Sequence, residues 1–347
     1  MTKIAIVGDL HFGKHGNDEK YLNFQSKWFV EELIPTIEKE RCSSLIFMGD
    51  VFDNRNSMNI LVMNAVRTLF SKLVKKYKVF IIVGNHDTYY RDTNDVNSVS
   101  FLEDIGVKVF KDITELTIEN RKFLFIPWVI PDNVSKLEIL LAHNNYDCVC
   151  GHLEINGFKK NHGLIHDSGL SPSLFSNCEK VYSGHFHLRD IQGKINYIGT
   201  PCELDWGDYG EDKGFVLLDL ETMNEQYVES TGIPRHVKLK SKDLSLDAIT
   251  REMIHHNFID FQFHEGITES DKIEYMQKIE AFKPLSFIHS DESSHKLSVK
   301  NEEELKTNLK DTLGALVEYM KLIDVPEGLD LNIALEKLKE VYDKSLD

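Results

Sequence analysis

The feature that most constrains this chain is a pattern that occurs five times, in which a short apolar run stops at a glycine that is followed by Asp, Asn or His. The runs, glycine included, cover residues 3–8, 44–49, 79–84, 147–151 and 180–184. Apolar runs bounded by glycine predict buried strands, and open α/β sheets place ligands at the carboxyl ends of their strands. If these strands are neighbours in sheets, the polar residues that follow them converge.

The convergent residues are of the types that hold divalent metals. Carboxylate and amide oxygens are hard donors and imidazole nitrogens are borderline donors, and both suit such ions. In an extended segment, residues two apart leave on the same side, which lets Asp9 and His11 reach a common ion and puts His185 and His187 on one face. The candidates are Asp9 and His11 after the first run, Asp50 after the second, Asn85, His86 and Asp87 after the third, His152 after the fourth, and His185 and His187 after the fifth.

Taken together and in this order, these blocks resemble the signature of the calcineurin-like metallophosphoesterases. The blocks are Asp9-x-His11, Gly49-Asp50, Gly84-Asn85-His86-Asp87, Gly151-His152 and Gly184-His185-x-His187. The resemblance implies an α/β fold, a two-sheet αββα sandwich, and phosphoester hydrolysis by a water that two metal ions activate.

The resemblance also implies a role for each residue. The first metal is expected on Asp9, His11, Asp50 and His187, and the second on Asp50, Asn85, His152 and His185, with Asp50 bridging the two. The absence of thiolates suits manganese or iron, with magnesium and zinc as alternatives.

His86 is expected to be a catalytic residue that binds no metal. An imidazole beside the substrate can protonate the leaving oxygen or neutralise charge on phosphorus. Asp87 is expected to orient His86 by accepting the proton of its other ring nitrogen. Asp53 stands where some nuclease relatives are expected to carry His, and it also fits a helix N-cap ahead of residues 56–57.

A later block narrows the resemblance to SbcD-type DNA repair nucleases, including the nuclease subunits of phage recombination complexes. It consists of the turn Tyr197-x-Gly199-Thr200-Pro201, then Trp206, and Lys213-Gly214 at the start of a strand. The resemblance implies a subunit with double-strand exonuclease and single-strand endonuclease activity, a small α+β cap domain that helps to hold DNA, and C-terminal helices that bind an SMC/ABC-type coiled-coil ATPase.

Three domains are expected: a nuclease domain over 1–232, an α+β cap over 233–300, and C-terminal helices over 301–347. Helices are predicted at 19–40, 58–74 and 96–105, and strands of the second sheet at 107–110 and 122–127. Apolar residues cover more than one face of 58–74, which fits either a well-buried helix or, with 96–105, the interface of a homodimer.

Composition limits how the chain meets DNA and where it works. A formal charge of −16 argues against an extensive DNA-binding surface and leaves a local basic patch, or a partner that supplies DNA affinity. No signal peptide and no uninterrupted apolar span is visible, so we expect a cytoplasmic protein, in the host cytoplasm if it is of phage origin. Five cysteines without C-x-x-C spacing indicate reduced thiols.

Two other functions fit the sequence less well. One is a phosphatase or phosphodiesterase that acts on nucleotides or phosphoproteins with the same metal centre. The other is a scaffold that kept the fold and lost turnover, although the complete ligand set argues against it.

Overall fold

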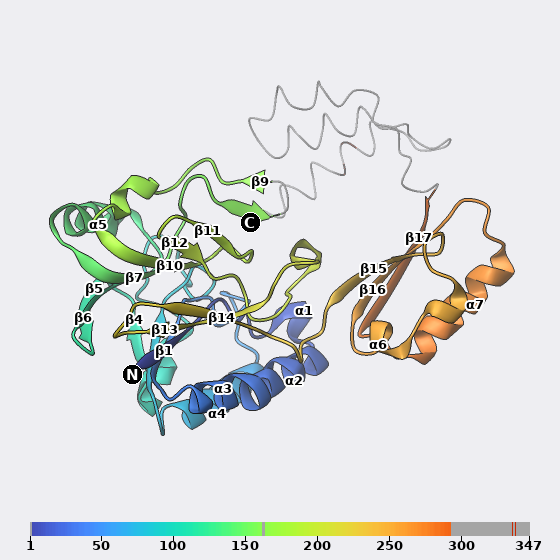
Figure 1. Cartoon of the computed structure of the whole chain (residues 1–347), viewed down its shortest axis with the longest axis horizontal. Helices are drawn as coiled ribbons and strands as arrows, with labels where there is room; N and C mark the ends of the chain where they lie inside the picture. The colour runs from blue at the N-terminus through green and yellow to red at the C-terminus, as the bar shows by residue number, and fades with distance from the viewer. Residues whose placement is uncertain (1, 162–163, 293–334, 336, 338–347) are drawn as a thin grey trace. The chain divides into compact units, whose positions relative to one another are not determined.

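The structure is a computed structural model that describes residues 2–161 and 164–292, together with residues 335 and 337 (Figure 1). The described chain divides into two compact units. The first comprises residues up to 237 with 253–258 and 284–286, and the second comprises 238–252, 259–283 and 287–292. The domain boundaries expected from the sequence stay a prediction, and the C-terminal helices expected over 301–347 lie outside the described residues, apart from residues 335 and 337.

Two six-stranded sheets form the first unit. The strands from β1 to β4 are parallel to one another, and β13 and β14 add antiparallel strands beside β1. The first sheet has the order β14 (Glu225–Glu229), β13 (Gly214–Asp219), β1 (Lys3–Val7), β2 (Cys42–Phe47), β3 (Lys78–Ile82), β4 (Lys108–Phe110).

The second sheet is parallel at its centre and has an antiparallel strand at each edge. Its order is β11 (Asp190–Gln192), β12 (Ile195–Tyr197), β10 (Cys178–Gly184), β7 (Tyr146–His152), β6 (Arg121–Ile126), β5 (Thr114–Ile118). A two-stranded ribbon, β8 (Lys159–Asn161) and β9 (Leu164–Ile165), stands apart from both sheets.

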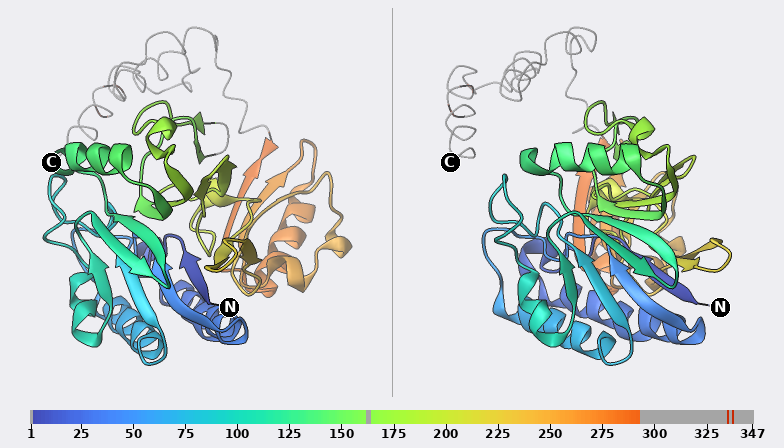
Figure 2. Two further views of the ribbon diagram at one scale, coloured as in Figure 1. Left: turned by 60° about the vertical axis from the view of Figure 1, so that its left-hand side comes forward. Right: turned by 90° about the vertical axis from the view of Figure 1, so that its left-hand side faces the viewer.

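Strand alternation produces the layers of this unit. Because successive side chains of a strand point to opposite faces, Ile4 and Ile6 of β1 pack between the two sheets, whereas Ala5 and Val7 face the helices. In the second sheet, Leu124 of β6 packs toward α5 (Pro131–His143) in the same way. Figures 1 and 2 show α5 on one side of the sheets and the helices α2 (Glu19–Trp28), α3 (Ile34–Lys39) and α4 (Ile60–Leu73) on the opposite side. The predicted two-sheet αββα sandwich is therefore confirmed.

The helices against the first sheet depart from the predicted bounds at points of local chemistry. They are α2, a π-helical turn (Phe29–Leu33), α3 and α4, and the short turn α1 (Lys14–Asn17), which buries none of its residues, precedes them. The π turn precedes Pro35, whose missing amide interrupts the helical hydrogen bonds expected over 19–40. Asn59 caps α4 by accepting from the amides of Leu61 and Val62. Only Ser100–Ile105 of the predicted helix 96–105 is helical, as a 3₁₀ turn.

The prediction that residues 107–110 belong to the second sheet is wrong. Strand β4 pairs in parallel with β3 in the first sheet, and the hairpin of β5 and β6 contributes the second-sheet strands instead. The side chain of Phe110 nevertheless packs between the sheets, with its ring 4.1 Å from that of Phe125. Because either sheet satisfies this apolar pattern, alternation alone did not specify the partner strand.

The cap region contains a three-stranded sheet and short helices. The sheet has the order β15 (His236–Lys240), β16 (Phe258–Phe263), β17 (Ser286–Asp291), and the helices are α6 (Arg251–Ile254) and α7 (Glu269–Ala281). Tyr275 of α7 packs its ring 5.2 Å from that of Phe261. Across the described residues, no helix combines the length and the apolar character needed to cross a membrane.

Candidate metal centre

The polar residues singled out in the sequence lie where five strands end, on the loops that follow β1, β2 and β3 and at the ends of β7 and β10. Three of them have positive φ angles, namely His11 (45°), Asp50 (47°) and His185 (83°). Residues other than glycine rarely adopt this left-handed conformation, and such strain clusters at functional sites. The backbone therefore holds these side chains in a conformation that the local sequence does not favour.

Glycines allow the loops to approach one another. A Cβ atom on Gly84 would overlap the carboxylate of Asp50, and one on Gly184 would overlap that of Asp9. These two glycines thus leave the space that the neighbouring carboxylates occupy.

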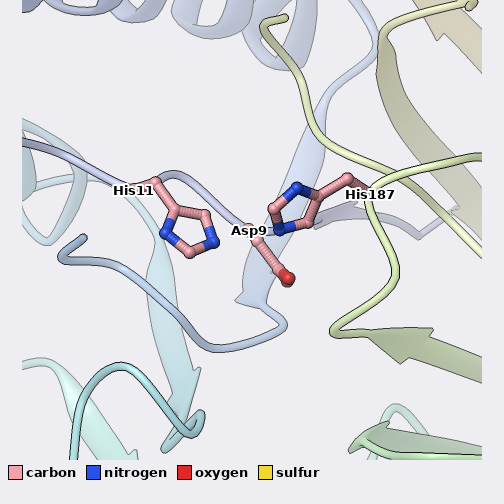
Figure 3. Close-up of side chains that lie close together, drawn as sticks. All are labelled: Asp9, His11 and His187. Carbon is pink, nitrogen blue, oxygen red and sulfur yellow. The ribbon is translucent and has the colours of Figure 1, made fainter. Parts of the chain in front are cut away.

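One group of donors is formed by Asp9, His11 and His187, whose donor atoms all lie within 4.8 Å of one another. Figure 3 shows the two imidazoles on either side of the Asp9 carboxylate. Asp50 adjoins this group, with its Oδ2 3.6 Å from His11 Nε2. This is the donor set expected for the first metal.

A second group is formed by Asn85, His152 and His185. Asn85 Oδ1 lies 2.9 Å from His152 Nε2 and 2.9 Å from His185 Nδ1. Asp50 Oδ2 lies 3.4 Å from His152 Nε2, so the same oxygen adjoins both groups. The structure thus brings together the seven residues expected as ligands, with Asp50 between the two sets.

The donors fit divalent cations. Among the described residues, Asp9 Oδ1 and His11 Nε2 are buried and have no hydrogen-bond partner. Buried polar atoms without partners are costly, and a cation would supply the missing interaction. Both sets contain only oxygen and imidazole nitrogen donors, which suits the divalent metals used in this chemistry.

Burial also shifts the protonation of the cluster. Burial raises the pKa of Asp9 to about 7, and it lowers the pKa of His187 well below its usual value, helped by the neighbouring His11. Burial also tends to raise the pKa of Asp50. The neighbouring His152 and His11 outweigh this effect, so the pKa of this carboxyl is lowered. Asp50 is therefore ionised between the two donor sets, as a bridging ligand must be.

Groups behind the donors fix the orientation of two imidazoles by hydrogen bonds, and a carboxylate adjoins a third. His152 Nδ1 lies 2.8 Å from the carbonyl of Met48, which leaves Nε2 to face Asn85. His185 Nε2 lies 3.1 Å from Glu154 Oε1, and His11 Nδ1 lies 3.3 Å from Asp53 Oδ1. Partners of this kind set the tautomer and direction of metal-binding histidines.

Sequence reasoning missed both carboxylates in this role. Glu154 follows His152 by two residues, a spacing that could have drawn attention to it. The alternative interpretation of Asp53 as a helix N-cap is wrong, because Asn59 caps α4 and the amides of Asn56 and Ser57 are bonded by Asn54.

His86 lies beside the two donor sets. Its amide donates to Asp50 Oδ1 at 2.7 Å, and its Nδ1 lies 2.6 Å from the carbonyl of Asp53. Its ring centroid is 4.8 Å from that of His11. Burial lowers its pKa. With Nδ1 donating to a carbonyl, Nε2 is the nitrogen left for a substrate.

The prediction that Asp87 accepts a hydrogen bond from the ring of His86 is wrong. Asp87 instead accepts from the amides of Val51 (3.1 Å), Phe52 (3.3 Å) and Gly84 (3.0 Å), and from the hydroxyl of Ser98 (3.2 Å). Four donors surround this carboxylate, and the ring of His86 is held elsewhere. Asp87 therefore ties the loop that carries Asp50 to the loop that carries Asn85.

The later sequence block packs behind the histidines. Lys213 is fully buried and donates to Asp208 Oδ1 at 2.8 Å and to the carbonyl of His187 at 2.9 Å. The hydroxyl of Tyr197 donates to the carbonyl of Leu153, next to His152, at 2.9 Å. These contacts position the segments that carry two of the candidate ligands.

This arrangement is that of a phosphoester-hydrolysing metalloenzyme. Residues 2–189 match the calcineurin-like phosphoesterase family, and this match covers more than half of the 347 residues. The chain belongs to this family.

The chain is also similar to individual known proteins. The chain is 30% identical over 230 residues to Exonuclease subunit 1 of Enterobacteria phage T4, covering 65% of this chain and 67% of that protein. It is 23% identical over 265 residues to 078R of Invertebrate iridescent virus 3, which is named as a candidate phosphoesterase. This match covers 73% of this chain and 70% of that protein. An archaeal phosphodiesterase structure aligns with a TM-score of 0.36 and 16% identity, covering 65% of this chain and 99% of that one.

Proposed function

We propose that this chain is the metal-dependent DNA nuclease subunit of a recombination or repair complex, with double-strand exonuclease and single-strand endonuclease activity. The observation that carries the proposal is the pair of donor sets that share Asp50, with His86 beside them. Similarity to a protein named as an exonuclease subunit supports a nuclease over other phosphoesterases.

The proposed ligands are Asp9, His11, Asp50 and His187 for one cation, and Asp50, Asn85, His152 and His185 for the other. When bound, the pair supplies Lewis acidity toward the phosphate and lowers the pKa of water. His86 is the proposed catalytic residue, acting through Nε2 on the leaving oxygen or on the charge at phosphorus. Asp87 is reassigned as a positioning residue. We propose manganese as the cation, with magnesium, iron and zinc as the alternatives to compare.

A small basic site next to His86 is proposed to bind the DNA backbone. A cavity of about 440 Å³ is lined by His86, Asp53, Tyr89 and two arginines, Arg55 and Arg91. Guanidinium groups bind phosphate well, and a local patch of this kind is what a chain with a charge of −16 requires. Replacing either arginine by Ala is expected to weaken DNA binding and to reduce its salt dependence.

Two interactions with other chains are part of the proposal. Residues 301–347 are proposed to bind an SMC/ABC-type coiled-coil ATPase, and deleting them should remove a copurifying ATPase. The start of α4 and the segment 96–105 are proposed to form a homodimer. Ile60 is 78% exposed and Val96 is 53% exposed, which leaves apolar surface for a second copy. The mass of the protein in solution tests this interface.

The activity is tested by manganese-supported cleavage of labelled single-stranded DNA. The full chain is expected to cleave, and His86→Ala is expected to lose cleavage while retaining its bound metal, because His86 is not a ligand. His143→Ala is the matched control, since His143 is exposed at the end of α5 and should leave cleavage unchanged.

The alternatives predict different outcomes. Hydrolysis of p-nitrophenyl phosphate or nucleotides without DNA cleavage would replace the nuclease by a phosphatase. Absence of both activities, with and without an ATPase partner, would indicate a scaffold.

A further inference from the structure

A second cavity, of about 380 Å³, opens in the first unit near the metal centre and is not used by the proposed chemistry. Its volume is within the range of small-ligand sites. Aromatic and imidazole rings dominate its walls, and two carboxylates stand beside them. The rings belong to His15, Tyr21, Trp206, His236 and Phe258, and the carboxylates to Asp18 and Asp205.

The rings form an ordered stacking surface. Phe258 stacks on His236, with centroids 4.6 Å apart and planes at 10°, and on His15, at 4.7 Å and 30°. Trp206 meets His236 edge-on at 4.7 Å. His236 is fixed from behind by the buried Glu203, whose Oε2 lies 3.0 Å from Nδ1. His236 and Phe258 are only 3% and 8% exposed, so the part of this wall open to a planar aromatic ligand is formed by the exposed His15 and the partly exposed Trp206.

The position of His15 requires a strained backbone conformation. His15 has φ 56° and ψ 40°, between the left-handed Gly13 and Gly16, and its side chain is exposed. A residue other than glycine in this conformation costs about 1 kcal/mol, and such strain is typical of binding sites. The loop that begins at the ligand His11 thus ends in an exposed ring stacked on Phe258.

The cavity adjoins the metal centre. Asp205 lines this cavity and also a smaller one of about 250 Å³, whose walls include His185 and His187. Lys14 lies between the two regions, with its ammonium 3.6 Å from Asp205 Oδ2 and 3.5 Å from Asp53 Oδ1. A ligand in the cavity can therefore be continuous with a group at the metals.

We infer that this cavity binds an unstacked nucleobase of the DNA strand, from a nucleotide that neighbours the scissile phosphate. The inference rests on the proposed nuclease function and adds a specificity site to it. Rings stack on any base, which explains the aromatic walls. The carboxylates would repel a phosphate, whereas they accept hydrogen bonds from exocyclic amino groups.

The carboxylates also predict which bases fit best. Asp18 Oδ1 accepts from the amide of Tyr21, which leaves Oδ2 for a ligand, whereas Asp205 uses Oδ1 for the amide of Gly207 and has Oδ2 3.6 Å from the ammonium of Lys14. Guanine, adenine and cytosine carry amino groups and thymine does not. Thymine is therefore expected to be the poorest occupant.

The test is a scan of a single-stranded oligonucleotide in which one nucleotide at a time is made abasic, cleaved by the full chain with manganese. One position, in fixed register with the cut, is expected to lose about fivefold or more in kcat/KM, because stacking on an aromatic side chain is worth at least this much. Thymine at that position should be cleaved more slowly than the other three bases.

Two variants connect the effect to the cavity. His15→Asn removes the ring while tolerating the left-handed backbone, and Phe258→Leu removes the stacking partner with little change in volume. Both should lower the rate on the intact strand and abolish the penalty of the abasic site. His143→Asn, on the exposed end of α5, should leave the penalty in place. Melting temperature and manganese content check that each variant is folded and loaded.

The outcomes separate this inference from the proposed function. A wild-type chain that hydrolyses bis(p-nitrophenyl) phosphate but not DNA would overturn the nuclease proposal, and the base site with it. DNA cleavage with no sensitive position would overturn the base site alone. An undiminished abasic penalty in both folded variants would do the same.

Discussion

Replacing Asp87 by Asn separates two roles for a residue that the sequence alone misassigned. In the structure, Oδ1 accepts from Val51, Phe52 and Ser98, and Oδ2 accepts from Gly84. The amide oxygen of Asn can keep the three contacts of Oδ1. Its NH₂ group would then face the Gly84 amide, so that two donors oppose each other at a distance of 3.0 Å.

The cost follows from this geometry. One buried hydrogen bond is lost and one buried N–H is left without an acceptor, which costs about 1–3 kcal/mol. We expect Asp87→Asn to lower the free energy of unfolding of the first unit by this amount and to weaken metal binding, because the loops of Asp50 and Asn85 are no longer tied together. Asp92→Asn, at an exposed position, should change stability by less than about 0.5 kcal/mol.

Urea unfolding followed by tryptophan fluorescence measures this loss, since Trp28, Trp128 and Trp206 all belong to the first unit. Cleavage rates at saturating manganese, compared with His86→Ala and with the double variant, measure any role in orienting His86. This reasoning would be refuted if Asp87→Asn had wild-type stability, cleaved DNA as slowly as His86→Ala, and lost no further activity in the double variant. Those results would indicate that Asp87 does bond to His86.

Three further predictions follow from buried contacts around the site. Gly84→Ala should lower manganese content and cost about 1–3 kcal/mol of stability, because its Cβ would overlap Asp50; metal analysis of the folded variant with full occupancy would contradict this. Lys213→Met should cost about 3–5 kcal/mol in urea unfolding, because it leaves Asp208 buried without its ion pair, and a wild-type transition would show that the pair contributes nothing. Chelation should abolish hydrolysis and lower the melting temperature, with about 2.7 kcal/mol lost if the metal had been 100-fold above its Kd, and equal melting of treated and untreated protein would argue against tight binding.

Much of the candidate site was visible in the sequence because its information is local. An apolar run that ends in glycine predicts a buried strand whose end a neighbouring loop can approach closely. The residue that follows the glycine then lies at the end of the strand. Asp9, Asp50 and His152 were therefore identified without knowledge of their neighbours, and the structure brings them together. The continuous apolar run of β1 likewise predicted a buried strand, and Ile4 and Ala5 are buried on its two faces.

What only the tertiary structure decided are the contacts between residues distant in sequence. Asp87 bonds to the loop after β2 because packing places the amides of Val51 and Phe52 next to it. The sequence did not specify that β4 pairs with β3 in the first sheet, because apolar alternation is satisfied on either side of the layer between the sheets.

The cavity beside the metal centre belongs to the same category, since its rings come from His15, Trp206, His236 and Phe258. No sequence period joins such positions. The sequence pattern determines which side of a strand is buried and which residue follows its end. Which distant residues contact one another across a core depends on the packing of the whole unit.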